Sequence, residues 1–122
     1  MKFNVEKCNQ LLKDPPAPIT LRVFFFMALN QHEQTGFLRT TKKYLAQMLG
    51  MDAKSLYVAL QWLYGNYMVH ETRCKGYYEF MVSPYYVEFG DNKKARLDEW
   101  NRRWAEHWKR IARRKPKSTM RR

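Results

Sequence analysis

The stretch TTKKYLAQMLGMDAKSLYVALQWL, residues 40–63, constrains the fold more than any other part of the chain. Apolar residues recur at helical spacing on both sides of Gly50. A glycine accepts the positive φ angle at which a helix of L-residues ends. We therefore predict one helix over about 42–49 and a second over about 52–64. The small side chain of Ala46 lets these two helices pack closely across a tight turn.

The part of the chain before this stretch is predicted to hold a linker, a helix and a strand. Residues 1–18 end in DPPAP, and prolines at this density favour a rigid, extended linker. Thr20 is a suitable N-cap for a helix over about 21–31. The apolar face of that helix comprises Leu21, Phe24, Phe25, Ala28 and Leu29. FLRT, residues 37–40, predicts a short strand.

The part after it is predicted to hold a β-hairpin and a long helix. Strand-like segments flank CKG, and Tyr78, Phe80 and Val82 share one side of the second strand. Asp91 or Asn92 caps the long helix. We expect an α+β fold, mainly α, arranged as a winged helix with the order helix, strand, helix, helix, β-hairpin. The predicted organisation is an N-terminal segment and linker 1–18, a winged-helix domain 19–90, a basic helix 91–115 and a flexible basic tail 116–122.

The net charge of +12 is concentrated in the last quarter of the chain. Residues 1–92 carry 10 basic and 8 acidic side chains, a net of +2. Residues 93–122 carry 13 basic and 3 acidic side chains, a net of +10. Such asymmetry indicates a polyanionic partner, most often nucleic acid and sometimes a membrane surface.

Several function classes find no support in the sequence. Cys8 and Cys74 lack the spacing of metal ligands, and we interpret them as free thiols in a reducing compartment. There is no phosphate-binding glycine loop and no nucleophile elbow, so we expect no catalytic activity, metal or cofactor. No apolar run approaches the roughly 20 residues that span a bilayer, and we expect a cytoplasmic protein.

The pattern across residues 42–61 resembles the helix-turn-helix motif of DNA-binding proteins, and the following hairpin resembles the wing of a winged helix. Leu45, Ala46, Leu49, Gly50, Met51, Leu56 and Ala59 carry this resemblance. It implies that the second helix enters the major groove of duplex DNA. The residues expected at the DNA are Thr40, Thr41, Lys42, Lys43, Ala53, Lys54, Ser55, Tyr57, Val58, Gln61, Arg73 and Lys75. Two alternatives are an ordinary α-hairpin and a winged helix that binds protein.

The residue types suggest different roles at such an interface. Lys54 can donate to guanine or to a phosphate, and Gln61 can pair with adenine. Tyr57 can reach a phosphate or a thymine methyl group, or pack partly into the core. Arg73 and Lys75 lie at the hairpin tip, where they can contact phosphates or enter the minor groove. The N-terminus of the second helix adds a dipole that favours a phosphate.

A narrower resemblance follows in FMVSPYYVEFGDNKKARLDEW, residues 80–100. This segment resembles one in plasmid replication initiators of the RepL type, where a strand runs into a Pro-Tyr-Tyr turn and then a charged helix. The resemblance implies replication initiation on a plasmid or phage, with the replication or transcription machinery as a further partner. A transcriptional repressor and a partition accessory protein use the same contacts. From another class, a protein-interaction module with a polyanion-binding tail remains an alternative.

The long helix carries one apolar stripe. Its members recur at intervals of three and four and are Leu97, Trp100, Trp104, Trp108 and Ile111. Tryptophan is costly to leave in water, so the stripe needs a partner surface. The domain's own sheet, the same helix of a second copy and the bases of a nucleic acid are the alternatives. We predict a homodimer, to which this stripe and the N-terminal segment around Phe3 and Val5 contribute.

Overall fold

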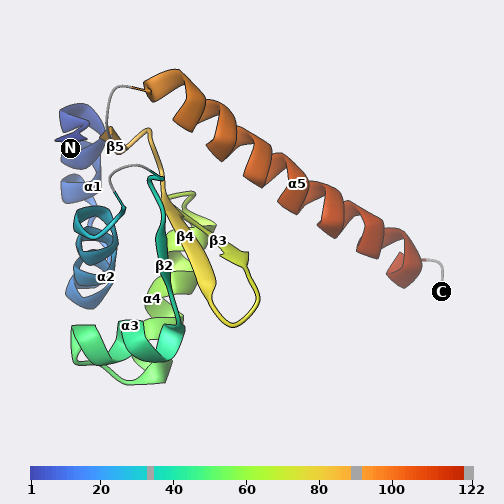
Figure 1. The fold of residues 1–122 in the computed structure, drawn as a ribbon, viewed down its shortest axis with the longest axis horizontal. Coiled ribbons are helices and arrows are strands. Elements are labelled where there is room, and N and C mark those ends of the chain that lie inside the picture. The colour runs from blue at the N-terminus through green and yellow to red at the C-terminus, as the bar shows by residue number, and fades with distance from the viewer. Residues whose placement is uncertain (33–34, 89–91, 120–122) are drawn as a thin grey trace.

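The computed structural model describes residues 1–32, 35–88 and 92–119, with the side chains of 114–119 left out. The fold is α+β and mainly helical, as predicted (Figure 1). The elements are β1 (Lys2–Phe3), α1 (Val5–Lys13), α2 (Pro18–Leu29), β2 (Leu38–Thr40), α3 (Lys42–Leu49), α4 (Ala53–Gly65), β3 (Val69–Arg73), β4 (Tyr78–Val82), β5 (Val87–Glu88) and α5 (Lys93–Thr119). From α2 to β4, this order is the one that the sequence predicted.

A three-stranded antiparallel sheet separates the helical core from α5. Its strand order is β2-β4-β3, so the short strand before the helix pair lies beside the second strand of the hairpin. Phe80 and Val82 face the core, and Tyr78 packs against it, which confirms their predicted common side. The alternate residues His70 and Glu79 are also buried, on the opposite face.

The helices α2, α3 and α4 form the other layer of the core. Val23, Phe24 and Met27 of α2 are fully buried, and α2 packs mainly against α4. Leu29 was predicted on the apolar face of its helix, but it is 62% exposed, and Met48 of α3 is 53% exposed. Each lies near the end of a short helix, where the apolar face no longer has an element to cover it.

The N-terminal segment 1–18 belongs to the body of the fold, which corrects its prediction as a separate segment. β1 pairs with β5, and Leu11 of α1 is part of the hydrophobic core. The helix predicted to begin after Thr20 begins at Pro18 instead. Proline suits the first helical turn because its missing N–H has no partner there. Thr20 is consequently inside the helix and buried.

The first half of α5 packs on the sheet, where Trp100 contacts His70 and Arg103 contacts Glu79. Its C-terminal half extends beyond the rest of the chain (Figure 1). Asn92 precedes α5, while Asp91 lies outside the described residues. We predicted a helix over 91–115, but it continues through Pro116 to Thr119. A proline removes one hydrogen bond to a carbonyl in the preceding turn, and here the helix continues for only three residues more. Within the described residues, no helix is long and apolar enough to cross a membrane.

Candidate nucleic-acid interface

The turn between α3 and α4 has the geometry that its sequence predicted. Gly50 adopts φ +64°, and its N–H donates to the carbonyls of Ala46 and Gln47. Asp52 caps α4 by accepting from the N–H of Ser55 at 2.7 Å. This hydrogen bond lowers the pKa of Asp52, so the carboxylate stays charged. An anion therefore already occupies the N-terminus of α4, and we no longer assign a phosphate contact to that helix dipole.

The outer face of α4 is exposed along its length. Leu56, Ala59, Leu60 and Leu63 point into the core. The predicted contact residues Ala53, Lys54, Tyr57, Val58 and Gln61 are exposed, and Ser55 is half-buried. Tyr57 and Val58 keep 60% and 59% of their surfaces accessible, so Tyr57 does not pack into the core. Large side chains exposed on a rigid helix form a ready contact surface.

The first turn of α3 is partly used inside the chain. The hydroxyl of Thr41 accepts from the N–H of Tyr44 at 3.1 Å and so acts as the N-cap. Lys42 forms an ion pair of 3.0 Å with Glu71 and lies over the ring of Tyr78. Thr40 is half-buried in β2, whereas Lys43 is exposed. Of these four predicted contacts, Lys43 is therefore the one whose side chain is fully available.

The hairpin tip places its two basic residues in solvent. The N–H of Cys74 donates to the carbonyl of Tyr77 at 2.9 Å and closes the tip. Gly76 has φ +86°, which a residue with a Cβ adopts rarely. Arg73 and Lys75 are both exposed beside this turn. Neither side chain belongs to the core or to a buried ion network among the described residues, so both charges are available to a partner.

The apolar stripe of α5 divides into a covered and an open part. Trp100 is only 4% exposed. Trp104 packs edge-on against the rings of His70 and Tyr67, with centroid distances of 4.9 and 4.8 Å. The stripe thus covers the chain's own sheet, one of the three alternatives. Leu97 and Ile111 are half-buried, and Trp108 is 49% exposed.

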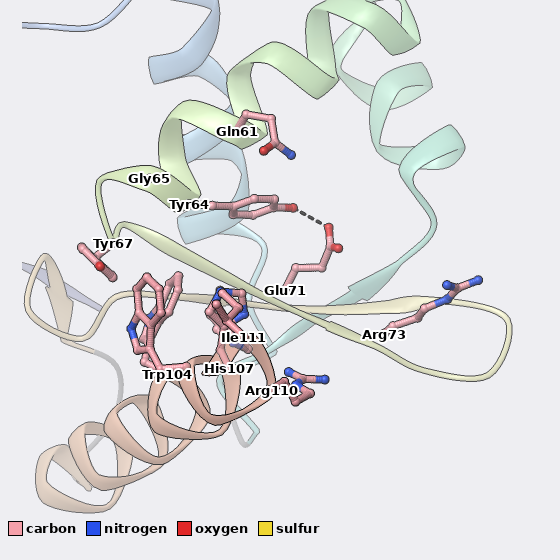
Figure 2. Close-up of a pocket in the computed structure, with 12 residues that line it drawn as sticks. Gln61, Tyr64, Gly65, Tyr67, Glu71, Arg73, Trp104, His107, Arg110 and Ile111 are labelled. Atoms are coloured by element: carbon pink, nitrogen blue, oxygen red, sulfur yellow. Dashed lines mark hydrogen bonds between the residues drawn. The ribbon is translucent and has the colours of Figure 1, made fainter. Parts of the chain in front are cut away.

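A cleft of about 590 Å³ separates the open part of the stripe from β3 and the end of α4 (Figure 2). Trp104, His107, Arg110 and Ile111 enter it from α5. Gln61 and Tyr64 enter it from α4, and Tyr64 donates to Glu71 at 2.5 Å. This cleft could not be predicted from the sequence, because its walls come from segments about 40 residues apart.

His70 is a buried histidine in the wall of this cleft. Burial lowers its pKa to about 4, and the nearby charges of Arg103 and Arg110 act in the same direction. It is therefore neutral at pH 7. Its Nδ1 atom and Nε1 of Trp104 are buried and have no hydrogen-bond partner among the described residues. The described residues contain no group of three side chains that could hold a metal ion.

A buried ion network, also missed from the sequence, holds α5 on the sheet. Glu79 of β4 accepts from Arg39 at 2.8 Å and from Arg103 of α5 at 2.6 Å. Arg103 also donates to Thr72 of β3 at 2.6 Å and to Glu99 at 2.5 Å. Burial disfavours the charge of Glu79, but the two arginines outweigh this effect and lower its pKa. The network fixes the direction in which α5 leaves the body.

Comparison with known proteins assigns the chain to no family. No protein-family model and no curated protein matches the chain. Among solved structures, the chain is similar to Pex from Synechococcus sp., with 18% sequence identity and a TM-score of 0.39. The match covers 81% of this chain and 96% of that one.

Proposed function

We propose that the chain is a winged helix that binds double-stranded DNA sequence-specifically. The exposed outer face of α4 carries this proposal. It combines Lys54 and Gln61, which can pair with base edges, with the apolar Val58, which suits a thymine methyl group. The surrounding elements support it, because helix, strand, helix, helix and hairpin with strand order β2-β4-β3 are the parts of a winged helix.

In this proposal, base contacts and backbone contacts come from different elements. Lys54 and Gln61 of α4 face the base edges in the major groove. Lys43 of α3 and Arg73 and Lys75 of the hairpin, which is the wing, contact phosphates. Lys42 acts indirectly, since its ion pair with Glu71 ties α3 to the wing. The +10 charge of residues 93–122 adds sequence-independent attraction to the DNA.

The biological process is proposed from the resemblance to RepL-type initiators. We propose initiation of plasmid or phage replication, or its control, in the bacterial cytoplasm. Repression of transcription and assistance in plasmid partition would use the same α4 face. A motif within a replication origin, within a promoter or within a partition locus would separate these roles.

One observation favours the rival proposal, a protein-interaction module. An apolar groove of about 640 Å³ lies between α3 and α4, lined among others by Ala46, Leu56 and Leu60. Lys42, Lys43 and Lys54 flank it, which would suit an acidic amphipathic helix. In this rival, the basic tail binds the polyanion alone, and duplex binding has no sequence preference.

We also propose that the protein binds DNA as a homodimer, but with a revised contact surface. Trp100 and Trp104 are used within the chain, and two copies of the strongly basic α5 would repel each other. The helix α1 has no such excess of charge, and its Val5 and Leu12 are 70% and 63% exposed. A second copy packed there would present two recognition helices to repeated half-sites.

Single substitutions test the assignment of α4. The probe is the duplex recovered from a random pool, compared with a scrambled duplex. We expect Lys54→Ala and Gln61→Ala to lose about 1–3 kcal/mol of discrimination each. Lys75→Ala removes the same charge as Lys54→Ala but contacts phosphate, so it should weaken binding to both duplexes alike. If Lys75→Ala alone changes discrimination, α4 is not the reading element.

A further inference from the structure

We propose that the cleft between α4, β3 and α5 is a second nucleic-acid site, which holds an unpaired nucleotide of a single strand. This single-strand site would act in addition to the proposed duplex interface, with which it shares Gln61 and Arg73. The cleft volume of about 590 Å³ accommodates one nucleotide. Its lining combines aromatic rings with Arg73 and Arg110, and its carboxylate, Glu71, is paired with Lys42. Aromatic rings with nearby cations are typical of sites that stack bases and hold phosphates.

Two half-exposed rings form the stacking surface. Trp108 of α5 and Tyr67, which follows α4, are 49% and 48% exposed, and their ring centroids are 6.4 Å apart. The rings of Trp104 and His107 pack around Trp108, with centroid distances of 6.5 and 5.3 Å, and hold its indole in place. The exposed face of a fixed indole offers a base the contact that a neighbouring base gives in a duplex. Bases inside a duplex are already stacked, so this surface selects an unpaired base.

The arginines of the cleft differ from those nearer the sheet. Arg102 is engaged by Glu99, and Arg103 by Glu79. Arg73 and Arg110, which line the cleft, form no ion pair within the part of the chain that the structure describes. Two guanidinium groups at the rim of an aromatic cleft are complementary to the phosphates on either side of a stacked base.

Two polar atoms are buried in the wall of the cleft without a partner among the described residues. They are Nε1 of Trp104, a donor, and Nδ1 of the neutral His70, whose ring centroids are 4.9 Å apart. Unpaired buried polar atoms are unfavourable. Both atoms are covered by the wall, so recognition of a strand depends on the exposed rings and on the two arginines of the cleft.

The position of the cleft connects it to the proposed duplex interface. Gln61 belongs to the outer face of α4 and also lines the cleft, and Arg73 belongs to the wing and does the same (Figure 2). A strand that separates from a duplex bound on α4 therefore reaches Trp108 without leaving the protein surface. We infer that the protein holds a junction between duplex and single strand, with the unpaired strand along α5.

The test measures single-strand binding by the full chain. The probes are a fluorescein-labelled 12-nucleotide oligothymidylate and the matching oligouridylate, which separate DNA from RNA as the source of the strand. Base stacking on the wild type should quench tryptophan fluorescence. Trp108→Ala should weaken binding about five- to a hundred-fold. Trp108→Phe should keep most of the affinity and lose most of the quenching, which also confirms that the fold is intact.

Two neighbouring charges provide the matched control. Arg110→Ala and Lys109→Ala each remove one positive charge from the same turn of α5, and only Arg110 lines the cleft. We expect Arg110→Ala to weaken oligothymidylate binding at least about three-fold more than Lys109→Ala, with duplex binding equally affected by both. Lys54→Ala should impair selection of a duplex motif and leave single-strand binding unchanged, so failure of one site is distinguishable from failure of the other.

Three results would overturn the proposal. One is single-strand binding that is absent in the wild type or unchanged in Trp108→Ala. Another is an equal loss for Arg110→Ala and Lys109→Ala, which would mean that only net charge matters. The third is a wild-type dimer in sedimentation that Trp108→Ala converts to monomers, because the cleft would then be the contact between two copies.

Discussion

Replacement of Glu79 by glutamine should destabilise the protein by separating α5 from the sheet. Glutamine keeps the volume of the side chain but removes the charge that Arg39 and Arg103 share. Loss of one partner of a buried ion pair costs about 3–5 kcal/mol. Arg103 keeps Glu99 and Thr72 as partners, and Arg39 is half-exposed. We therefore expect Glu79→Gln to lower the free energy of unfolding by about 2–3 kcal/mol.

Urea denaturation followed by circular dichroism measures this difference. Glu106→Gln is the matched control, because it removes the same charge from an exposed position of α5. Surface changes of this kind usually stay within about 0.5 kcal/mol. If Glu79→Gln costs less than about 1 kcal/mol, or no more than Glu106→Gln, the network does not hold α5 on the sheet.

Three further predictions follow from the charges and exposed surfaces. The unfolded chain binds a proton at His70 below pH 6.5, and the folded chain binds it only near pH 4. The contribution of neutral His70 to the free energy of unfolding is therefore fully present above pH 6.5 and should fall by about 2 kcal/mol by pH 5. Thermal melts of His70→Gln should lack this loss. The wild type should sediment as a dimer at tens of micromolar and Leu12→Ser as a monomer; a monomeric wild type rejects the dimer. With about six phosphates contacted, log K for duplex DNA should fall with a slope near −5 against log salt, and a slope near zero contradicts the electrostatic account.

Local signals explain why the helix pair was predicted well. The left-handed conformation of Gly50 and the cap at Asp52 depend on neighbours within a few residues, so the sequence contains all that determines them. Where two local signals competed, the prediction was wrong. Thr20 and Pro18 are both helix-start residues, and the helix begins at Pro18, whose missing N–H costs no hydrogen bond in the first turn.

Contacts between distant segments could not be predicted in this way. The spacing of the α5 stripe predicted a helix with one apolar face, but not that Trp104 meets His70 of β3. The pairing of Glu79 with Arg103 depends on which side of the sheet α5 crosses. The cleft beside Trp108 is a consequence of the same crossing, since α5 leaves the sheet before its stripe ends.

Selection of bound sequences from a random duplex pool tests the central claim most directly. The account predicts that the wild type enriches a defined motif at a salt concentration that suppresses non-specific attraction, and that Lys54→Ala changes the preferred base at one position of that motif. Binding through charge alone would enrich no motif. That result, or a motif that stays the same when the α4 face is altered, would contradict sequence-specific binding by α4.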